Sequence, residues 1–89
     1  MIRRPVTIIN RLGLHARAAS KLVETATGYS SDVWLERDSK RINGKSIMGV
    51  LMLAAAKDTE LTLEVAGEDE SQALSAITQL IASRFGEDD

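Results

Sequence analysis

The chain has 89 residues, with one proline, no cysteine and a formal net charge of -2 at neutral pH. This length predicts a single domain over residues 1–89, and the lack of cysteine excludes disulfides and thiolate metal sites, so a hydrophobic core must hold the fold. The acidic balance, with a sequence pI of about 5.3, argues against nucleic acid as the main partner.

No segment approaches the roughly 18 apolar residues of a membrane-spanning helix, and the start MIRRPVTIIN lacks the apolar region of a secretory signal. We therefore expect a soluble, cytoplasmic protein with no membrane insertion. The uneven charge distribution fits either ordinary solvated faces or a basic rim on an acidic molecule. Its basic residues include Arg3, Arg4, Arg11, Arg17, Lys21, Arg37, Lys40, Arg41 and Lys45, and the acidic residues toward the end are Glu68, Asp69, Glu70, Glu87, Asp88 and Asp89.

The first half of the chain predicts a strand, a helix and a hairpin. Residues 5–10 are rich in β-branched side chains and begin with a proline, which is typical of the first residue of an edge strand. From about residue 16 apolar residues recur with helical spacing, and Gly28 is expected to end this helix. Residues 32–37 alternate as a strand, and residues 40–43 return after a turn.

The second half predicts a short helix, a strand and a long helix. Ser46 is the expected N-cap of a helix over residues 47–55, and residues 61–67 alternate as the clearest strand. Acidic residues at 68–70 suit the positive end of a final helix. The apolar face of that helix consists of Ala73, Leu74, Ile77, Leu80, Ile81 and Phe85.

The predicted order of elements is β-α-β-β-α-β-α. Each strand has one apolar face, so helices on one side of a single sheet would bury the apolar faces of all the strands and helices. The sequence therefore predicts an α+β fold, in which a four-stranded antiparallel or mixed sheet keeps its other face in water.

The residue types exclude several kinds of site. One histidine and no cysteine leave no metal-binding spacing, and no serine or carboxylate lies close to His15 in sequence to form a hydrolytic triad. The stretch NGKS, residues 43–46, lacks the first glycine of a P-loop, because Ser39 stands there. The aromatic residues are too few to stack RNA bases on a sheet; they are Tyr29, Trp34 and Phe85.

His15, the single histidine, is expected at the N-cap or first turn of the helix that begins near Ala16. Unpaired backbone N–H groups and the positive end of the helix dipole favour an anion there. The dipole and Arg17 disfavour a positive ring, leaving a nitrogen lone pair for attack, and both would stabilise an attached phosphoryl group. Small residues at Ala16, Ala18 and Ala19 would leave room for a partner protein. A histidine that only caps the helix is the alternative interpretation.

The stretch LGLHARAA, residues 12–19, resembles the active-site signature of the HPr family, the histidine-containing phosphocarriers of the phosphoenolpyruvate-dependent phosphotransferase system. GKSIMGVLMLAA, residues 44–55, resembles the regulatory segment of that family, and the similarity covers essentially the whole chain. The resemblance implies an open-faced β-sandwich of four antiparallel strands and three helices. It also implies that Nδ1 of His15 accepts a phosphoryl group from phospho-enzyme I and passes it to IIA-type proteins, with Arg17 steadying the group. Such a protein is a carrier rather than a self-contained enzyme, and needs no cofactor.

The second motif implies regulation. Ser46 falls at the position that HPr kinase/phosphorylase modifies in many relatives, and a phosphate there would add about two negative charges beside the docking face. For the apolar docking candidates, core packing is the other interpretation. The apolar candidates are Leu14, Ile47, Met48, Leu51 and Met52, and the other docking candidates are Ala18, Lys21 and Lys45.

The chain departs from the family at Ala18, where proline is usual, and this concerns helix rigidity more than phosphotransfer. The HARAA form and the FGEDD ending resemble the nitrogen-related branch, NPr, whereas KSIMGV resembles the branch under serine-kinase control, so the sequence leaves sugar transport and nitrogen regulation both open. A non-transferring regulatory module that binds partners through the same face is the second function hypothesis. We expect a monomer.

Overall fold

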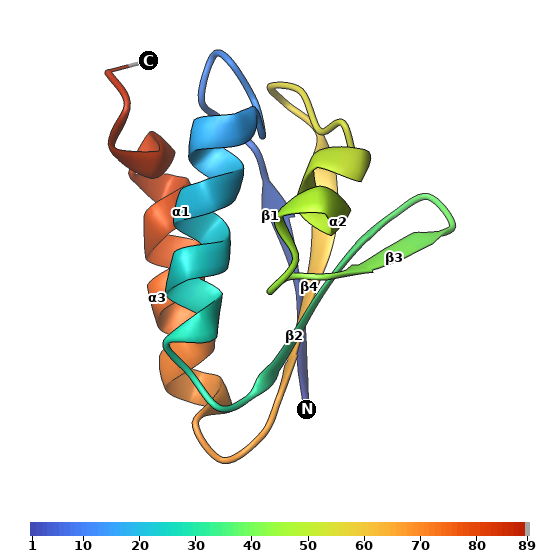
Figure 1. Ribbon diagram of the computed structural model, residues 1–89, viewed down its shortest axis with the longest axis vertical. Coiled ribbons are helices and arrows are strands. Elements are labelled where there is room, and N and C mark those ends of the chain that lie inside the picture. The colour runs from blue at the N-terminus through green and yellow to red at the C-terminus, as the bar shows by residue number, and fades with distance from the viewer. Residues whose placement is uncertain (89) are drawn as a thin grey trace.

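The computed structural model describes residues 1–88, so Asp89, counted above in the acidic ending, lies outside the described residues. The strands and helices follow the predicted order (Figure 1). They are β1 (Ile2–Thr7), α1 (Ala16–Thr27), β2 (Asp32–Arg37), β3 (Lys40–Asn43), α2 (Ile47–Met52), β4 (Glu60–Ala66) and α3 (Glu70–Ala82), followed by a 3-10 turn, η1 (Arg84–Gly86).

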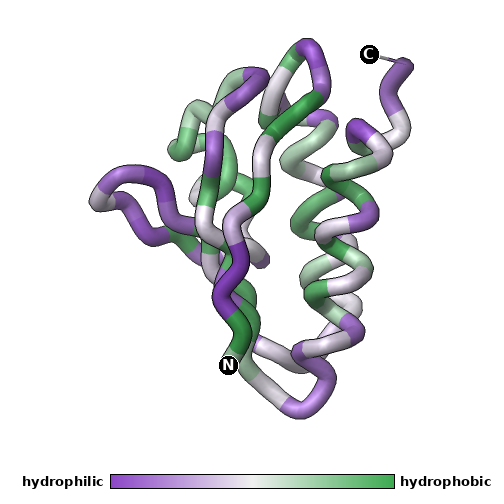
Figure 2. Tube along the Cα trace, turned by 180° about the vertical axis from the view of Figure 1, so that it is seen from behind, coloured by the Kyte–Doolittle hydropathy of each residue, from purple (hydrophilic) through white to green (hydrophobic). Residues whose placement is uncertain are grey.

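The four strands form one antiparallel sheet in the order β1-β4-β2-β3. The helices cover one face of this sheet, which confirms the predicted open-faced α+β fold. In Figure 2, α1 and α3 alternate between hydrophobic and hydrophilic residues along their length, as expected for helices with one apolar face. The strand residues buried beneath the helices are Val6, Val33, Leu35, Leu61, Leu63 and Val65.

Two strands are displaced from their predicted positions. β1 covers residues 2–7 instead of 5–10, and Pro5 lies inside it rather than at its first residue. Proline is tolerated there because β1 pairs only with β4 and is an edge of the sheet. β4 covers residues 60–66, one residue earlier than predicted.

Two helices end earlier than their apolar patterns predicted. α2 ends at Met52 instead of residue 55, and Ala54 just beyond it has a φ of 50°, which a regular right-handed α-helix does not contain. α3 ends at Ala82, and Phe85 lies in η1 with a φ of 56°. The Phe85 ring is nevertheless fully buried. Its apolar character therefore correctly predicted that the side chain is buried. The prediction that Phe85 belongs to the final helix was wrong, because it lies in η1.

Asp69 ties the start of α3 to the segment after α1 instead of capping its own helix. Its carboxylate accepts hydrogen bonds from the N–H groups of Ser30 and Ser31, both at 2.9 Å, and from the Ser31 hydroxyl at 2.5 Å. These bonds, that of the Ser31 hydroxyl foremost, lower the pKa of Asp69 to about 2. Glu70 keeps the predicted acidic position in the first turn of α3.

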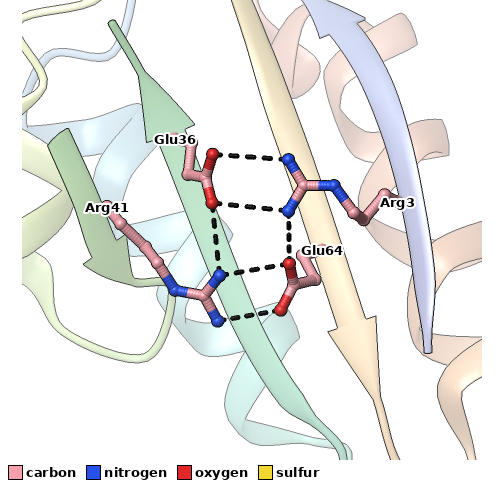
Figure 3. Close-up of polar contacts among 4 residues, drawn as sticks. All are labelled: Arg3, Glu36, Arg41 and Glu64. Carbon is pink, nitrogen blue, oxygen red and sulfur yellow. Dashed lines mark hydrogen bonds and ion pairs between the residues drawn. The ribbon is translucent and has the colours of Figure 1, made fainter. Parts of the chain in front are cut away.

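The sheet face opposite the helices carries a charged cluster that joins all four strands: Arg3, Glu64, Glu36 and Arg41 (Figure 3). The nearly buried carboxylate of Glu64 accepts from Arg3 at 2.5 Å and from two nitrogens of Arg41 at 3.1 and 2.8 Å. Glu36 accepts more distantly from both arginines. The Arg41 guanidinium also lies 4.6 Å from the centre of the Trp34 ring, so a cation covers that ring.

Replacing Glu64 by glutamine should lower the free energy of unfolding and weaken its pH dependence. The hydrogen bonds of Arg41, against the opposing effect of burial and with help from Arg3, lower the pKa of Glu64. Because the folded-state pKa is depressed, this stabilisation is present above the unfolded pKa of about 4.3 and is lost as the pH falls through the folded value. Urea unfolding at pH 7 and pH 3 should show a smaller acid-induced loss for E64Q than for the parent.

Glu60, exposed at the start of the same strand, supplies the matched control. E60Q removes the same charge without touching the cluster, so it should follow the parent at both pH values. Equal behaviour of E60Q and E64Q would refute the role given to Glu64.

Candidate functional site

The loop between β1 and α1, residues 8–15, is fixed against the segment that precedes β4. The N–H of Leu14 donates to the carbonyl of Ala55 at 2.8 Å. Gly13 has a φ of +69°, and a Cβ there would lie 2.5 Å from the same carbonyl oxygen. This position therefore requires glycine, and it delivers His15 to a fixed place at the start of α1.

His15 is the N-cap of α1, as the sequence predicted, with extended backbone angles. Its Nδ1 accepts a hydrogen bond from the N–H of Arg17 at 3.3 Å. A nitrogen that accepts from an N–H holds a lone pair and no proton, so the remaining ring proton belongs on Nε2. The capping geometry therefore presents Nδ1 as the nucleophilic nitrogen, and the side chain is 29 % exposed.

The other ring nitrogen faces a carboxylate that sequence analysis did not identify. Nε2 of His15 donates to Oε2 of Glu87 at 2.5 Å. The second oxygen of Glu87 accepts from Nδ2 of Asn10 at 3.0 Å, and that amide also donates to the carbonyl of Gly13 at 2.8 Å. Figure 1 shows why the contact forms, since the C-terminal end of the chain and the start of α1 lie at the same end of the molecule.

The surroundings of Glu87 favour its charged form. Partial burial raises the pKa of the carboxyl, but hydrogen bonds from Asn10 and His15, with the electrostatic attraction of the His15 ring and of Lys21, outweigh burial and lower it. The carboxylate therefore accepts from His15 as an anion at neutral pH.

A rigid turn presents Glu87. Arg84 and Phe85 both have positive φ angles, of 58° and 56°, which the burial of the Phe85 ring helps to hold. Nζ of Lys21 donates to the Phe85 carbonyl at 2.6 Å. Lys21, predicted as a docking residue, thus ties α1 to the turn that carries Glu87.

Arg17 lies next to this ring on an exposed part of α1. Within residues 1–88 its guanidinium makes no hydrogen bond or ion pair, so it is available to an incoming anion. A shallow pocket brings these groups together, and its lining consists of Arg11, Leu12, His15, Arg17, Glu87 and Asp88. Sequence analysis had assigned no site role to Arg11 or Leu12.

α2 contributes an exposed apolar surface near this end of the molecule. Met48 and Met52 are 69 % and 61 % exposed, and Ile47 is 44 % exposed. Leu51 is half-buried against the core. Leu12, in the loop before His15, is 58 % exposed and extends the apolar candidates to the rim of the pocket.

Two of the predicted docking residues are wrong, because they lie in the core. Leu14 is 5 % exposed and Ala18 is fully buried. Ala19 is fully buried as well, so these alanines are small because α1 packs closely and not because they leave room for a partner. Lys45 is half-buried and its Nζ donates to the Tyr29 carbonyl at 2.8 Å, which gives it a structural contact.

Ser46 is the N-cap of α2, as predicted. Its hydroxyl accepts from the N–H of Gly49 at 3.1 Å. The side chain is half-buried and directly precedes the exposed residues Ile47 and Met48.

Over residues 1–88, no group of three or more histidine, cysteine, aspartate or glutamate side chains is arranged to hold a metal ion. No helix in that part of the chain is both long enough and apolar enough to cross a membrane.

Comparisons with known proteins agree with each other. Residues 2–83 match the family model described as the PTS HPr component phosphorylation site. The phosphocarrier protein HPr of Neisseria meningitidis serogroup A is 52 % identical over 87 residues, covering 98 % of both chains. HPr of Cupriavidus necator is 51 % identical over the same length and coverage.

Solved structures show the same likeness. The HPr-C-His protein of Thermoanaerobacter tengcongensis matches with a TM-score of 0.96 and 42 % identity, covering all of both chains. The HPr dimer of the same organism matches with a TM-score of 0.79 and 42 % identity, covering 98 % of this chain and all of that one.

Proposed function

Since this chain belongs to the HPr family of phosphocarriers of the phosphotransferase system, we propose that His15 is the residue on which it carries the phosphoryl group. The chain is a phosphocarrier in the relay and not a catalytic enzyme. The observation that supports His15 most directly is its Nδ1, which accepts the Arg17 N–H at the start of α1.

The geometry suits both forms of the carrier. In the free form, the Nδ1 lone pair has only a long hydrogen bond of 3.3 Å to release before it attacks phosphorus. In the phosphorylated form, the phosphoryl oxygens replace the lone pair as acceptors for the Arg17 N–H, and the nearby guanidinium balances their charge. Arg17 therefore serves through both its backbone and its side chain.

The family role implies partners within the phosphotransferase system, such as enzyme I as donor and IIA proteins as acceptors. The proposed docking surface for them consists of the exposed apolar residues that border the site, namely Leu12, Ile47, Met48 and Met52, with Leu51 at its edge. Exposed apolar side chains gathered beside a reactive group are a common feature of protein interfaces. No observation favours the non-transferring module over this reading.

We extend the proposal to the state of the chain in the cell. The buried apolar residues form one core cluster, which supports a single-domain carrier over residues 1–89, and we propose that it acts as a monomer. A relative from Thermoanaerobacter tengcongensis has been solved as a dimer. A role in a relay that starts from phosphoenolpyruvate supports a cytoplasmic location.

We also propose that Ser46 is a regulatory phosphorylation site, for an ATP-dependent kinase of the HPr kinase/phosphorylase type. Its hydroxyl precedes Ile47 and Met48 in the docking surface. A phosphate there adds about two negative charges to an apolar interface and opposes docking by desolvation.

Incubation with enzyme I and labelled phosphoenolpyruvate should give one acid-labile, base-stable phosphoryl group per chain, and His15→Ala should abolish it. Because His15 also caps α1, the alanine variant should lose about 1 kcal/mol of stability. His15→Asn keeps a capping side chain and cannot form the phosphohistidine, so it should be stable and unlabelled. Labelling of a folded H15N at the parent level would refute the assignment.

Met48→Glu should raise the KM of enzyme I for this chain about tenfold, because a charge replaces an apolar contact at the docking surface. Thermal unfolding should be nearly unchanged, since the side chain is 69 % exposed. Gln72→Glu, on the exposed side of α3, introduces the same charge away from α2 and should leave KM as in the parent. An unchanged KM for M48E would remove Met48 from the docking surface.

Mass spectrometry after incubation with ATP and a kinase of the HPr kinase/phosphorylase type should locate one phosphate on Ser46. The modified chain should then accept phosphoryl groups from phospho-enzyme I more slowly. Ser46→Ala should block the modification and, by removing the N-cap of α2, cost about 1 kcal/mol of stability. Modification of another serine in the S46A variant at the parent rate would contradict the assignment.

A further inference from the structure

We propose that Glu87, held by the buried side chain of Asn10, is a positioning residue for phosphoryl transfer: it fixes the attacking tautomer of His15 and balances the positive charge that the ring acquires. This inference rests on the proposed function of His15. It assigns a role to two residues that lie outside both sequence motifs.

The hydrogen bonds on the ring select one tautomer of His15. The Arg17 N–H requires a lone pair on Nδ1, and the Glu87 carboxylate, at 2.5 Å, requires a proton on Nε2. These two contacts are satisfied together only by the neutral tautomer protonated on Nε2. Each of them leaves Nδ1, and not Nε2, as the nitrogen that can attack.

Glu87 leaves the reactive side of the ring open. Its carboxylate contacts Nε2, on the far side of the imidazole from Nδ1. Arg17, which approaches from the Nδ1 side, remains exposed. A donor protein can therefore reach Nδ1 while the carboxylate stays in place.

Asn10 is fully buried. Its amide nitrogen donates to Glu87 and to the Gly13 carbonyl, yet its Oδ1 has no hydrogen-bond partner within residues 1–88. A buried, unpaired carbonyl is costly, and an apolar side chain would avoid that cost. The contacts of Nδ2 account for an asparagine here, because they hold the loop before His15 and the carboxylate of Glu87 in one arrangement.

The transfer of the phosphoryl group to His15 forms one bond to phosphorus and breaks one. The Nδ1 lone pair forms a bond to phosphorus as the bond between phosphorus and a nitrogen of the donor phosphohistidine breaks, and the electron pair of that bond goes to the donor nitrogen. Nε2 keeps its proton, so the ring of His15 becomes positive. Transfer to an acceptor returns the electron pair to Nδ1 and removes the charge.

The Glu87 carboxylate therefore interacts more strongly with the charged ring than with the neutral one. A group that is already in place, partly shielded from water and opposite in sign to the developing charge stabilises the transition state more than the starting state. This mainly predicts an effect on the rate of transfer, with little effect on docking.

Glu87→Gln tests the inference, because it keeps the size of the side chain and removes its charge. The ¹⁵N chemical shifts of the two ring nitrogens report the tautomer in the free protein. The parent should be protonated on Nε2, and E87Q should show a new population protonated on Nδ1. The kcat for phosphorylation by enzyme I should fall about tenfold, as expected when a charged hydrogen-bond acceptor is replaced by a neutral one, with KM nearly unchanged.

Glu24→Gln is the matched control, since Glu24 is an exposed residue of α1 and removing its charge should change neither readout. Glu87→Asp restores the charge on a shorter side chain and should recover part of the rate. A folded E87Q protein that keeps the parent tautomer, or that transfers at the parent rate, overturns the inference. A parent that accepts no phosphoryl group on His15 overturns the proposed function instead, so the two failures are distinguishable.

Discussion

The lone pair on Nδ1 of His15 has two uses in this molecule. It accepts the Arg17 N–H and so caps α1, and in the proposed transfer it is the electron pair that attacks phosphorus. One lone pair cannot do both at once. In the phosphorylated form that we propose, the helix therefore needs a substitute acceptor, which the phosphoryl oxygens would supply. Three features keep this nitrogen at the helix start. They are the position of the loop over residues 8–15, the glycine at position 13 within it, and the packing of α1.

Two parts of the chain that are distant in sequence hold that nitrogen in place. The segment before β4 accepts the N–H of Leu14 through the Ala55 carbonyl. The turn after α3 is held by a buried phenylalanine ring and by Lys21, and it presents Glu87 to Nε2. Because each anchor belongs to the packed body of the molecule, the ring is oriented by the fold as a whole and not by α1 alone. This is the preorganisation that transfer between proteins requires, since the partner meets a ring that already points outward.

Features that depend on neighbours a few residues apart could be predicted from the sequence. The N-caps His15 and Ser46 and the hairpin over residues 32–43 are of this kind. The roles of Glu87 and Asn10 could not be predicted in this way. Glu87 lies 72 positions after His15, and no local sequence pattern indicates that their side chains are in contact. Apolar character likewise predicted that a residue would make apolar contacts, but not whether those contacts are with the core or with a partner protein. Ala18 and Leu14 were docking candidates and lie in the core, whereas the candidate Met48 is exposed. Which apolar face of a helix turns inward depends on where the sheet lies, and this is a property of the tertiary structure.

The charged cluster on the open sheet face has a consequence for how the two edges of the sheet respond to change. β1 and β3 never touch, yet Arg3 from one and Arg41 from the other bind the same carboxylate of Glu64. When either guanidinium is lost, Glu64 keeps the other as a partner. Damage at the two edges is therefore not independent. The loss of both arginines leaves a nearly buried anion without either of its strong partners, so we expect its penalty to exceed the sum of the single losses.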